Sequence, residues 1–152
     1  MITKYAQSVI VESYEEMARV ADILLEALVQ INVDYLQRHP FVPPNPIAAG
    51  IYYDPPPLSF RTSLHPTCSV PVLLARGRGK CDSIAAYDVA GRRIAGQTAR
   101  VAIEFQGDGL FHVMSEVLVY GQWKLIDISQ ELPRYENPQS CSVTGTDETC
   151  DC

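Results

Sequence analysis

Apolar residues near the start of the chain recur with the spacing of an amphipathic helix. Ser13 and Glu16 form the capping box that typically opens a helix, and Pro40 ends the pattern. Leu25 and Val29 lie off the main apolar stripe, so the helix is apolar on more than one side. Either the domain covers both faces or one face meets a partner. The main stripe consists of Met17, Val20, Ala21, Leu24, Ala27, Leu28, Ile31 and Tyr35.

The helical pattern then breaks in a proline-rich stretch. Nine of the eleven prolines fall within residues 40–71, where they exclude long regular elements because proline lacks a backbone donor and restricts its predecessor. Short extended pieces are expected at Ala49–Tyr53 and Val70–Ala75. An irregular stretch of this length is typical of a lid, a groove wall or a linker. Its tyrosines and Phe60 favour packing over a free linker.

Helical spacing returns after this stretch and is followed by strand-like alternation. A second helix is expected at Cys81–Ala95, with Gly96 as the residue that stops it. Its apolar face consists of Ile84, Tyr87, Ala90, Gly91 and Ile94. Three strands follow, at Ala99–Phe105, Phe111–Tyr120 and Trp123–Ile128, joined by turns at 106–109 and 121–122. Two helices followed by an antiparallel meander predict the α+β class.

From Glu131 onward the periodic pattern dissolves into an acidic tail. The tail has five acidic residues and one arginine, a net of −4, so it carries most of the formal charge of −6. We therefore expect a single domain over residues 1–130 and a cysteine-containing tail over 131–152. Within the domain, residues 1–38 form the N-terminal helix, 39–76 the proline-rich region and 77–130 the core that carries the chemistry.

The composition excludes several functional classes. With 152 residues, 47% of them hydrophobic and 20% charged, the chain suits one packed domain and not a disordered protein. The negative charge argues against nucleic acid as the main partner. No apolar run has the roughly 18–20 residues of a membrane span. The N-terminus also lacks the pattern of a signal peptide, so a reducing, cytoplasmic location is expected.

One cysteine stands where a reactive thiol would be expected. Cys81 opens the second helix directly after a glycine-rich turn, and a helix N-terminus favours thiolate. Nearby basic residues are expected to lower the thiol pKa further; they are Arg76, Arg78, Lys80, Arg92 and Arg93. His112 and Asp127, on the second and third strands, supply a base and a group to orient it. The backbone N–H of Cys81 is a candidate oxyanion donor.

The expected strand register separates two members of this triad. With a two-residue turn at 121–122, Asp127 falls on the same face as His112 but opposite Glu116. It would then lie four residues from His112, roughly 13 Å along an ideal strand. Strong twist, a bulge or a longer turn would have to close that gap.

Four short motifs together carry a family resemblance. Gly79–Ala85 resembles the G-x-C motif at a helix start, and Ala99–Ile103 resembles the A-R-V strand that follows it. Phe111–Val117 is similar to an H-V-x-x-E strand, and Gly121–Asp127 to a W-x-x-x-D strand. In this order and spacing, the motifs resemble those of transglutaminase-like enzymes in the papain-like cysteine protease superfamily. The likeness is to the small stand-alone members found in bacteria and phages.

The resemblance implies a fold and a reaction. The fold would be a papain-like core, with the nucleophile at a helix N-terminus packed on an antiparallel β-meander. Cys81 would be the nucleophile, His112 the base and Asp127 its orienter, acting on protein or peptide amides as a thiol protease or amidase. A transamidase that cross-links proteins is an alternative. No cofactor or metal is implied. The sequence departs from the family in having Asp82 after the nucleophile, and no upstream glutamine or tryptophan completes the oxyanion hole.

Two alternatives from other functional classes stay open. The chain could be a non-catalytic assembly protein that retains the fold, for example a component of a phage particle, joined to its assembly through the N-terminal helix or the tail. Its location would then be the virion. It could also be a domain that binds a peptide without cleaving it.

The remaining polar and aromatic candidates have ordinary structural interpretations. Glu116 is expected to pair with a basic residue, and Asp82 to cap the second helix while opposing a thiolate at Cys81. Trp123 is expected in the core. His39 and His65 are interpreted as ordinary polar residues of the proline-rich region.

The cysteines other than Cys81 pose a separate question. Cys68, Cys141, Cys150 and Cys152 can form two disulfides in three connectivities and leave Cys81 as the free thiol. A reducing compartment argues against such disulfides. A metal site built on Cys81 and His112 lacks a second pair of ligands, so no metal is expected.

Overall fold

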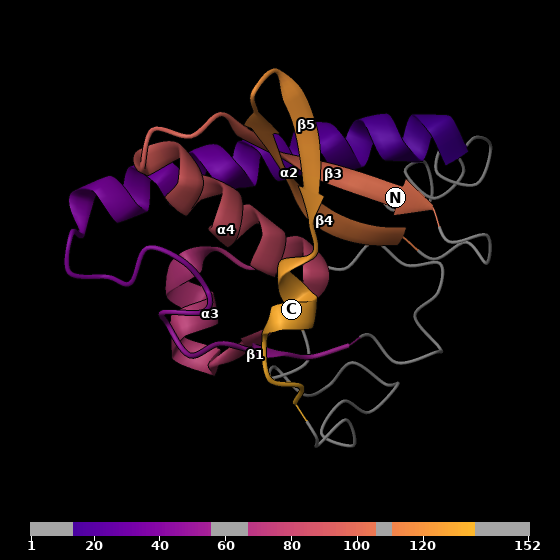
Figure 1. Cartoon of the computed structure of the whole chain (residues 1–152). Helices are drawn as coiled ribbons and strands as arrows, with labels where there is room; N and C mark the ends of the chain where they lie inside the picture. Colours follow the sequence, from indigo (N-terminus) through magenta and orange to yellow (C-terminus); the bar gives the residue numbers. More distant parts are fainter. Residues whose placement is uncertain (1–13, 56–66, 106–110, 136–152) are drawn as a thin grey trace, which may run out of the picture.

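The structure is a computed structural model that describes residues 14–55, 67–105 and 111–135 (Figure 1). Helices and a three-stranded antiparallel sheet make this part of the chain α+β, as predicted. In chain order the elements are α2 (Tyr14–Arg38), β1 (Tyr52–Tyr53), α3 (Val70–Arg76), β2 (Arg78–Gly79), α4 (Cys81–Ile94), β3 (Ala99–Phe105), β4 (Phe111–Val119), β5 (Gln122–Ile126) and the 3-10 helix η2 (Ile128–Glu131). None of the helices in these ranges combines the length and hydropathy that a membrane span needs.

Helix α4 is the centre of the domain. It packs against α2 on one side and against β3 and β4 on the other (Figure 1). The residues from Cys81 to Gly91 are buried or nearly so, because neighbouring elements surround this helix. Gly91 admits the closest approach, since a Cβ there would lie 1.8 Å from the carbonyl oxygen of Pro44. The loop after α2 therefore lies directly on the α4 backbone.

Helix α2 buries only part of its main apolar stripe. Leu28 of that stripe enters the core together with Leu25, Val29 and Leu36, whereas Val20, Leu24 and Ile31 of the stripe, together with Ile23, are exposed. The guanidinium of Arg93 on α4 donates to both carboxylate oxygens of Glu26, at 2.6 and 2.8 Å. This ion pair holds the two helices in one rotational setting. The helix ends at Arg38, before Pro40, as predicted.

The segment expected to be extended at Val70–Ala75 is instead the helix α3, so that prediction was wrong. Pro71 lies in the first turn, where a helix needs no backbone donor and the fixed φ of proline already suits it. Gly77 ends the helix with a φ of 72°, a left-handed conformation that glycine adopts without strain. The side chain of Asn32 on α2 accepts a hydrogen bond of 3.0 Å from the Val70 N–H. Proline here starts a helix and does not prevent one.

The three-stranded sheet has the order β3-β4-β5 and turns one face toward α4. Val113, Ser115 and Val117 of β4 are buried, and Ser115 donates 2.7 Å to Asp88 of α4. Alternation places His112, Met114 and the other even-numbered residues of β4 on the opposite face. The expected strands are confirmed to within two residues at each end.

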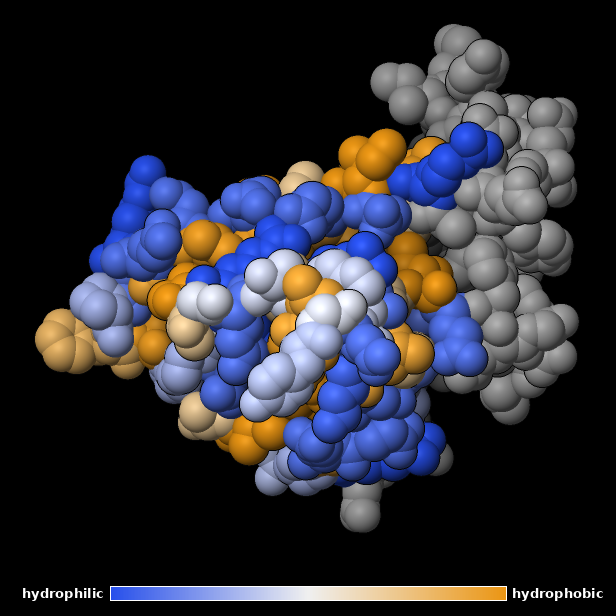
Figure 2. All heavy atoms as spheres, turned by 45° about the horizontal axis from the view of Figure 1, so that its top comes forward, coloured by the Kyte–Doolittle hydropathy of each residue, from blue (hydrophilic) through white to orange (hydrophobic). Residues whose placement is uncertain are grey.

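Trp123 does not lie in the core as expected, because it falls on the face of the sheet turned away from α4. Its side chain is 39% exposed, and the guanidinium of Arg100 lies 3.8 Å from its ring centroid. Arg100 also bonds at 2.7 Å to Glu116, which confirms that Glu116 pairs with a basic residue. On the face seen in Figure 2, apolar side chains reach the surface in several patches between hydrophilic ones.

A second, smaller sheet joins three distant parts of the chain. Strands β1 and β2 pair in parallel, with Tyr53 opposite Gly79. Arg134, beyond η2, forms a bridge to Tyr53 from the other side. The buried pair Asp54 and Arg78 lies 3.8 Å apart within this sheet. The described residues after Glu131 thus pack on β1, beside the strand that leads into α4 (Figure 1).

Candidate active site

Cys81 is the first residue of α4 and follows β2 after a single residue. That residue, Lys80, is extended, with φ −85° and ψ 170°, so the chain runs straight from the small sheet into the helix. Gly79 packs tightly here, since a Cβ would meet the side chain of Leu73 at 2.3 Å. The Cys81 side chain is a free thiol and only 7% exposed.

The pKa of the Cys81 thiol is raised, which contradicts the low value that the sequence predicted. Burial, followed by the negative charge of Asp82, raises the pKa of the thiol to about 12. Backbone hydrogen bonds from Val113 and Asp82 act in the opposite direction but do not offset burial. The helix N-terminus alone therefore does not generate a thiolate.

The basic residues that were expected to lower the thiol pKa are engaged elsewhere. Arg78 pairs with Asp54, Arg92 with Asp88 at 2.7 Å and Arg93 with Glu26. The charge of Lys80 acts on Asp82, whose carboxylate accepts a 2.7 Å hydrogen bond from the Ser83 N–H as a cap of α4. Sequence proximity indicated positively charged surroundings, but the fold gives Arg78, Arg92 and Arg93 acidic partners.

His112 and Asp127 meet on the outer face of the sheet. Nε2 of His112 lies 2.7 Å from Oδ2 of Asp127, and both side chains are partly buried. The other carboxylate oxygen, Oδ1, accepts a 2.6 Å hydrogen bond from Ser129. Asp127 is thus held from two sides, by the ring of His112 and by the first turn of η2.

The register that permits this contact differs from the expected one by two residues. The turn of the β4–β5 hairpin is Tyr120-Gly121, so Val119 pairs with Gln122. Both turn residues have positive φ, 49° and 78°, which is the geometry of a tight two-residue hairpin turn. Glu116 consequently lies opposite Leu125, and Asp127 continues the register opposite Met114, two residues from His112. The expected separation of four residues was wrong.

The Cys81 thiol lies against the same strand as His112. The backbone of Val113, the residue after His112, hydrogen-bonds to the Cys81 sulfur. The charge of Asp127 also acts on the thiol and raises its pKa. The N-terminus of α4, the start of β4 and the end of β5 therefore converge; the structure joins His112 to Asp127 directly and links Cys81 to this pair through the Val113 backbone and the charge of Asp127.

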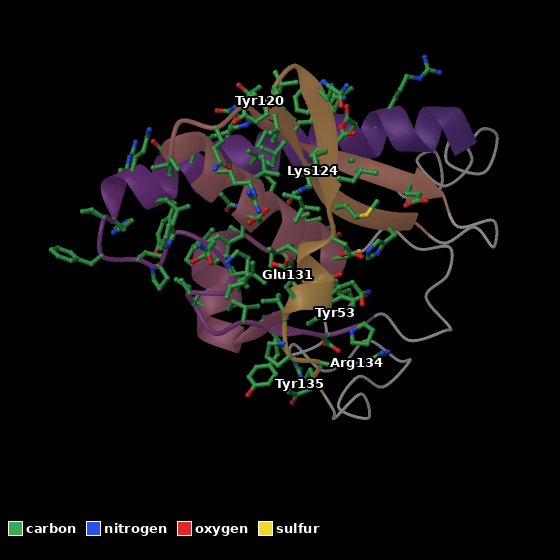
Figure 3. All side chains as sticks on the ribbon, in the orientation of Figure 1. Tyr53, Tyr120, Lys124, Glu131, Arg134 and Tyr135 are labelled. Atoms are coloured by element: carbon green, nitrogen blue, oxygen red, sulfur yellow. The ribbon has the colours of Figure 1, made fainter. Side chains whose placement is uncertain are left out.

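Two residues of this site were missed by the sequence analysis. Ser129 fixes Asp127, and its position in a 3-10 helix after the last strand gave no periodic signal. Tyr53 lies in the proline-rich region, where only its aromatic character suggested packing. Burial, followed by the charges of Cys81 and Asp127, raises the pKa of its phenol well above the ordinary range. Figure 3 shows Tyr53 beside Arg134 and Tyr135, below η2.

The other candidate residues lie apart from this cluster or outside the described residues. His39 is exposed and its ring lies 4.3 Å from that of Tyr35. Cys68 is disulfide-bonded, and Cys81 is a free thiol. Ser13, Phe60, His65 and the tail cysteines Cys141, Cys150 and Cys152 all lie outside those residues. Within the described ranges, no group of three His, Cys, Asp or Glu side chains is placed to hold a metal ion.

Comparison with protein-family models, curated proteins and solved structures finds no match to this chain.

Proposed function

We propose that this protein is a cysteine-nucleophile acyl-transfer enzyme that acts on amide bonds of proteins or peptides. One observation carries the proposal, which is the 2.7 Å contact between His112 and Asp127. The residue after His112, Val113, hydrogen-bonds through its backbone to the free thiol of Cys81. Nucleophilic acyl transfer requires a thiol, an imidazole and a carboxylate that orients it, and these are the groups that the end of β5, the start of β4 and the N-terminus of α4 carry.

The proposed reaction proceeds through a thioester. With Nε2 bound to Asp127, Nδ1 of His112 is the ring nitrogen left to accept the thiol proton. The sulfur electron pair forms the C–S bond, the carbonyl π pair moves to oxygen, and the proton passes to Nδ1. Collapse of the oxyanion breaks the C–N bond, and the leaving amine takes the proton from His112. Water activated by His112 then hydrolyses the thioester and restores the thiol.

The raised thiol pKa determines when the proton moves. A thiol with a pKa of about 12 does not form a stable ion pair with an imidazole before substrate binds. His112 therefore acts as a general base during the attack, and Asp127 stabilises the imidazolium that results. These steps use only side chains of the chain and need no cofactor.

Hydrolysis is the favoured outcome because the resemblance is to small bacterial and phage members of the transglutaminase-like family, in a papain-like fold. An amine in place of water would make the same site a transamidase. A cytoplasmic or virion location stays a prediction. The disulfide at Cys68 favours the virion, since disulfides persist on virion surfaces and are rare in the cytosol.

The test is acylation of the thiol by p-nitrophenyl acetate. The release of nitrophenol measures the rate, and peptide mapping identifies the acetylated residue. Cys81 should be acetylated in the native protein, and the acetyl group should pass to water, or to glycinamide when it is added. His112→Ala should slow acylation about 100-fold or more, the scale of general-base catalysis. Asp127→Asn should slow it by a smaller factor of about 10 or more.

A non-catalytic assembly protein is the second candidate, and the exposed apolar residues of α2 favour it. Ile23 is 69% exposed and Ile31 is 58% exposed, on a helix otherwise packed against α4. In that case Cys81 acylation would be no faster than in His112→Ala. The acylation experiment therefore decides between the two candidates.

A further inference from the structure

We propose that the phenol of Tyr53 donates the second hydrogen bond to the oxyanion formed at Cys81, beside the backbone N–H of Cys81 itself. This inference rests on the proposed acyl-transfer function and supplies the donor that no upstream glutamine or tryptophan provides. Tyr53 would touch the reacting oxygen and would keep its own proton throughout.

The backbone fixes Tyr53 from both sides. Asp54, its neighbour on β1, donates its N–H to the carbonyl of Gly79 at 2.9 Å. On the other side, the Tyr53 N–H donates to Pro133 at 2.9 Å, and the Tyr135 N–H donates to the Tyr53 carbonyl at 2.7 Å. The segment is therefore held between β2 and the chain after η2, which fixes the backbone position from which the Tyr53 side chain extends.

The strand register places Tyr53 beside the chain that leads to the nucleophile. Tyr53 pairs with Gly79, two residues before Cys81. Lys80 between them is extended, so Tyr53 is offset from the start of α4 by roughly 6.6 Å along the chain. The side chain of Leu73 packs over Gly79, which fixes the backbone that Tyr53 pairs with.

The electrostatics of the phenol agree with this geometry. Burial, followed by the charges of Cys81 and Asp127, raises the pKa of Tyr53, so the phenol and these two groups act on one another electrostatically. Its raised pKa keeps the phenol neutral at working pH, so the proton needed for donation is present. Its exposed neighbour Tyr52 faces the other way and lies 6.5 Å, centroid to centroid, from Tyr135.

Two reagents that differ in mechanism provide the test. Acylation by p-nitrophenyl acetate passes through an oxyanion, whereas alkylation by iodoacetamide does not. Tyr53→Phe should slow acylation of Cys81 by about 10-fold or more and leave its alkylation rate within about 2-fold of native. Tyr52→Phe, the matched control, should change neither rate. Both rates are followed on the Cys81 peptide by mass spectrometry, with a thermal melt for each variant.

The outcomes separate this inference from the proposed function. Equal acylation in Tyr53→Phe and the native protein would overturn the role of Tyr53 alone, as would an equal loss of acylation and alkylation. Native protein whose Cys81 is not acylated would overturn both. A second measurement avoids dependence on folding of the variant: the native protein should discriminate against the thionoester analogue, whose sulfur is a poor hydrogen-bond acceptor. A rate ratio equal to that of a free thiol in solution would contradict the proposal.

Discussion

At the scale of residues, the candidate site depends on how Asp127 is held. His112 engages one carboxylate oxygen and Ser129 the other, so the carboxylate has little freedom to rotate. The imidazole is fixed in turn, with Nε2 committed to Asp127. Ser129 acts through Asp127 and is a positioning residue. Its burial in η2 couples the site to the chain segment that clamps Tyr53.

The raised pKa of Cys81 predicts a pH dependence of stability. The folded thiol has a pKa of about 12 against an ordinary value of 9.0, so the native state holds its proton more tightly than the unfolded chain does. This contribution is complete below about pH 9 and is lost as pH rises toward 12. When the pH is raised from about 8 to about 10.5, the urea midpoint of unfolding should therefore fall less for Cys81→Ala than for the native protein.

The control for this prediction is the absolute stability at neutral pH, which Cys81→Ala lowers only through lost packing. Tyr53 and Tyr87 have raised pKa values of the same sign, so both proteins retain some alkaline sensitivity. An identical midpoint shift in the two proteins would contradict the raised thiol pKa.

The sequence pointed to the residues of the candidate site but not to their environment. Cys81, His112 and Asp127 could be selected because a thiol at a helix start, an imidazole and a carboxylate follow in the right order. The thiol pKa could not be predicted, because it depends on burial and on which acid each arginine meets. Tyr53 could not be found, because its partner Gly79 lies across a parallel pairing that no local pattern encodes.

At the scale of elements, the β4–β5 hairpin sets the spacing within the site. Its turn at Tyr120-Gly121 brings Asp127 two residues from His112, and a register shift of one residue would move Asp127 to the other face. The turn residue Tyr120 has a positive φ of 49°, which is unfavourable for a bulky side chain. The sequence placed the turn one residue too far along the chain, and it therefore did not predict that Val119 and Gln122 are the paired residues that flank the turn.

Replacing Tyr120 by asparagine should stabilise the protein. Tyr120 is fully exposed at the tip of the hairpin, 102% relative to a reference tyrosine, so little packing is lost (Figure 3). Asparagine tolerates the left-handed conformation and forms, with Gly121, the preferred pair for this turn. We expect Tyr120→Asn to raise the free energy of unfolding by about 1 kcal/mol in urea denaturation.

Tyr120→Val is the matched comparison, because a β-branched residue is less compatible with a positive φ. It should be less stable than the native protein. A loss of stability in Tyr120→Asn would show that the ring contributes more than its conformation costs.

At the scale of the whole molecule, α4 links every part of the site. It carries Cys81, packs against β4, which carries His112, and against η2, which follows Asp127, and receives the loop after α2 at Gly91. The sequence indicated this helix and its apolar face, but a helix surrounded on all sides cannot be recognised from one stripe. Helix α2 illustrates the same difficulty. It is apolar on more than one side, and the core takes Leu25 and Val29 in place of Leu24 and Ile31 of the main stripe.

Gly91→Ala tests how tightly the parts are joined. The added Cβ would lie 1.8 Å from the Pro44 carbonyl oxygen, and backbone on both sides must move to admit it. We expect a loss of about 2 kcal/mol or more in the free energy of unfolding, together with slower acylation of Cys81. Gly96→Ala, which meets open space but has a φ of 87°, should cost about 1 kcal/mol and leave acylation unchanged. Equal losses in the two variants would contradict the close contact.

The hairpin tip also bears on how relatives of this chain would be recognised. Because Val119 and Gln122 close the turn, extra residues inserted between them lengthen the tip without moving His112 away from Asp127. The fifteen positions that separate the two are thus no fixed signature, and a search that demands that count would discard diverged homologues. The tip is equally a place where a fluorophore or an epitope could be grafted while His112 and Asp127 keep their contact.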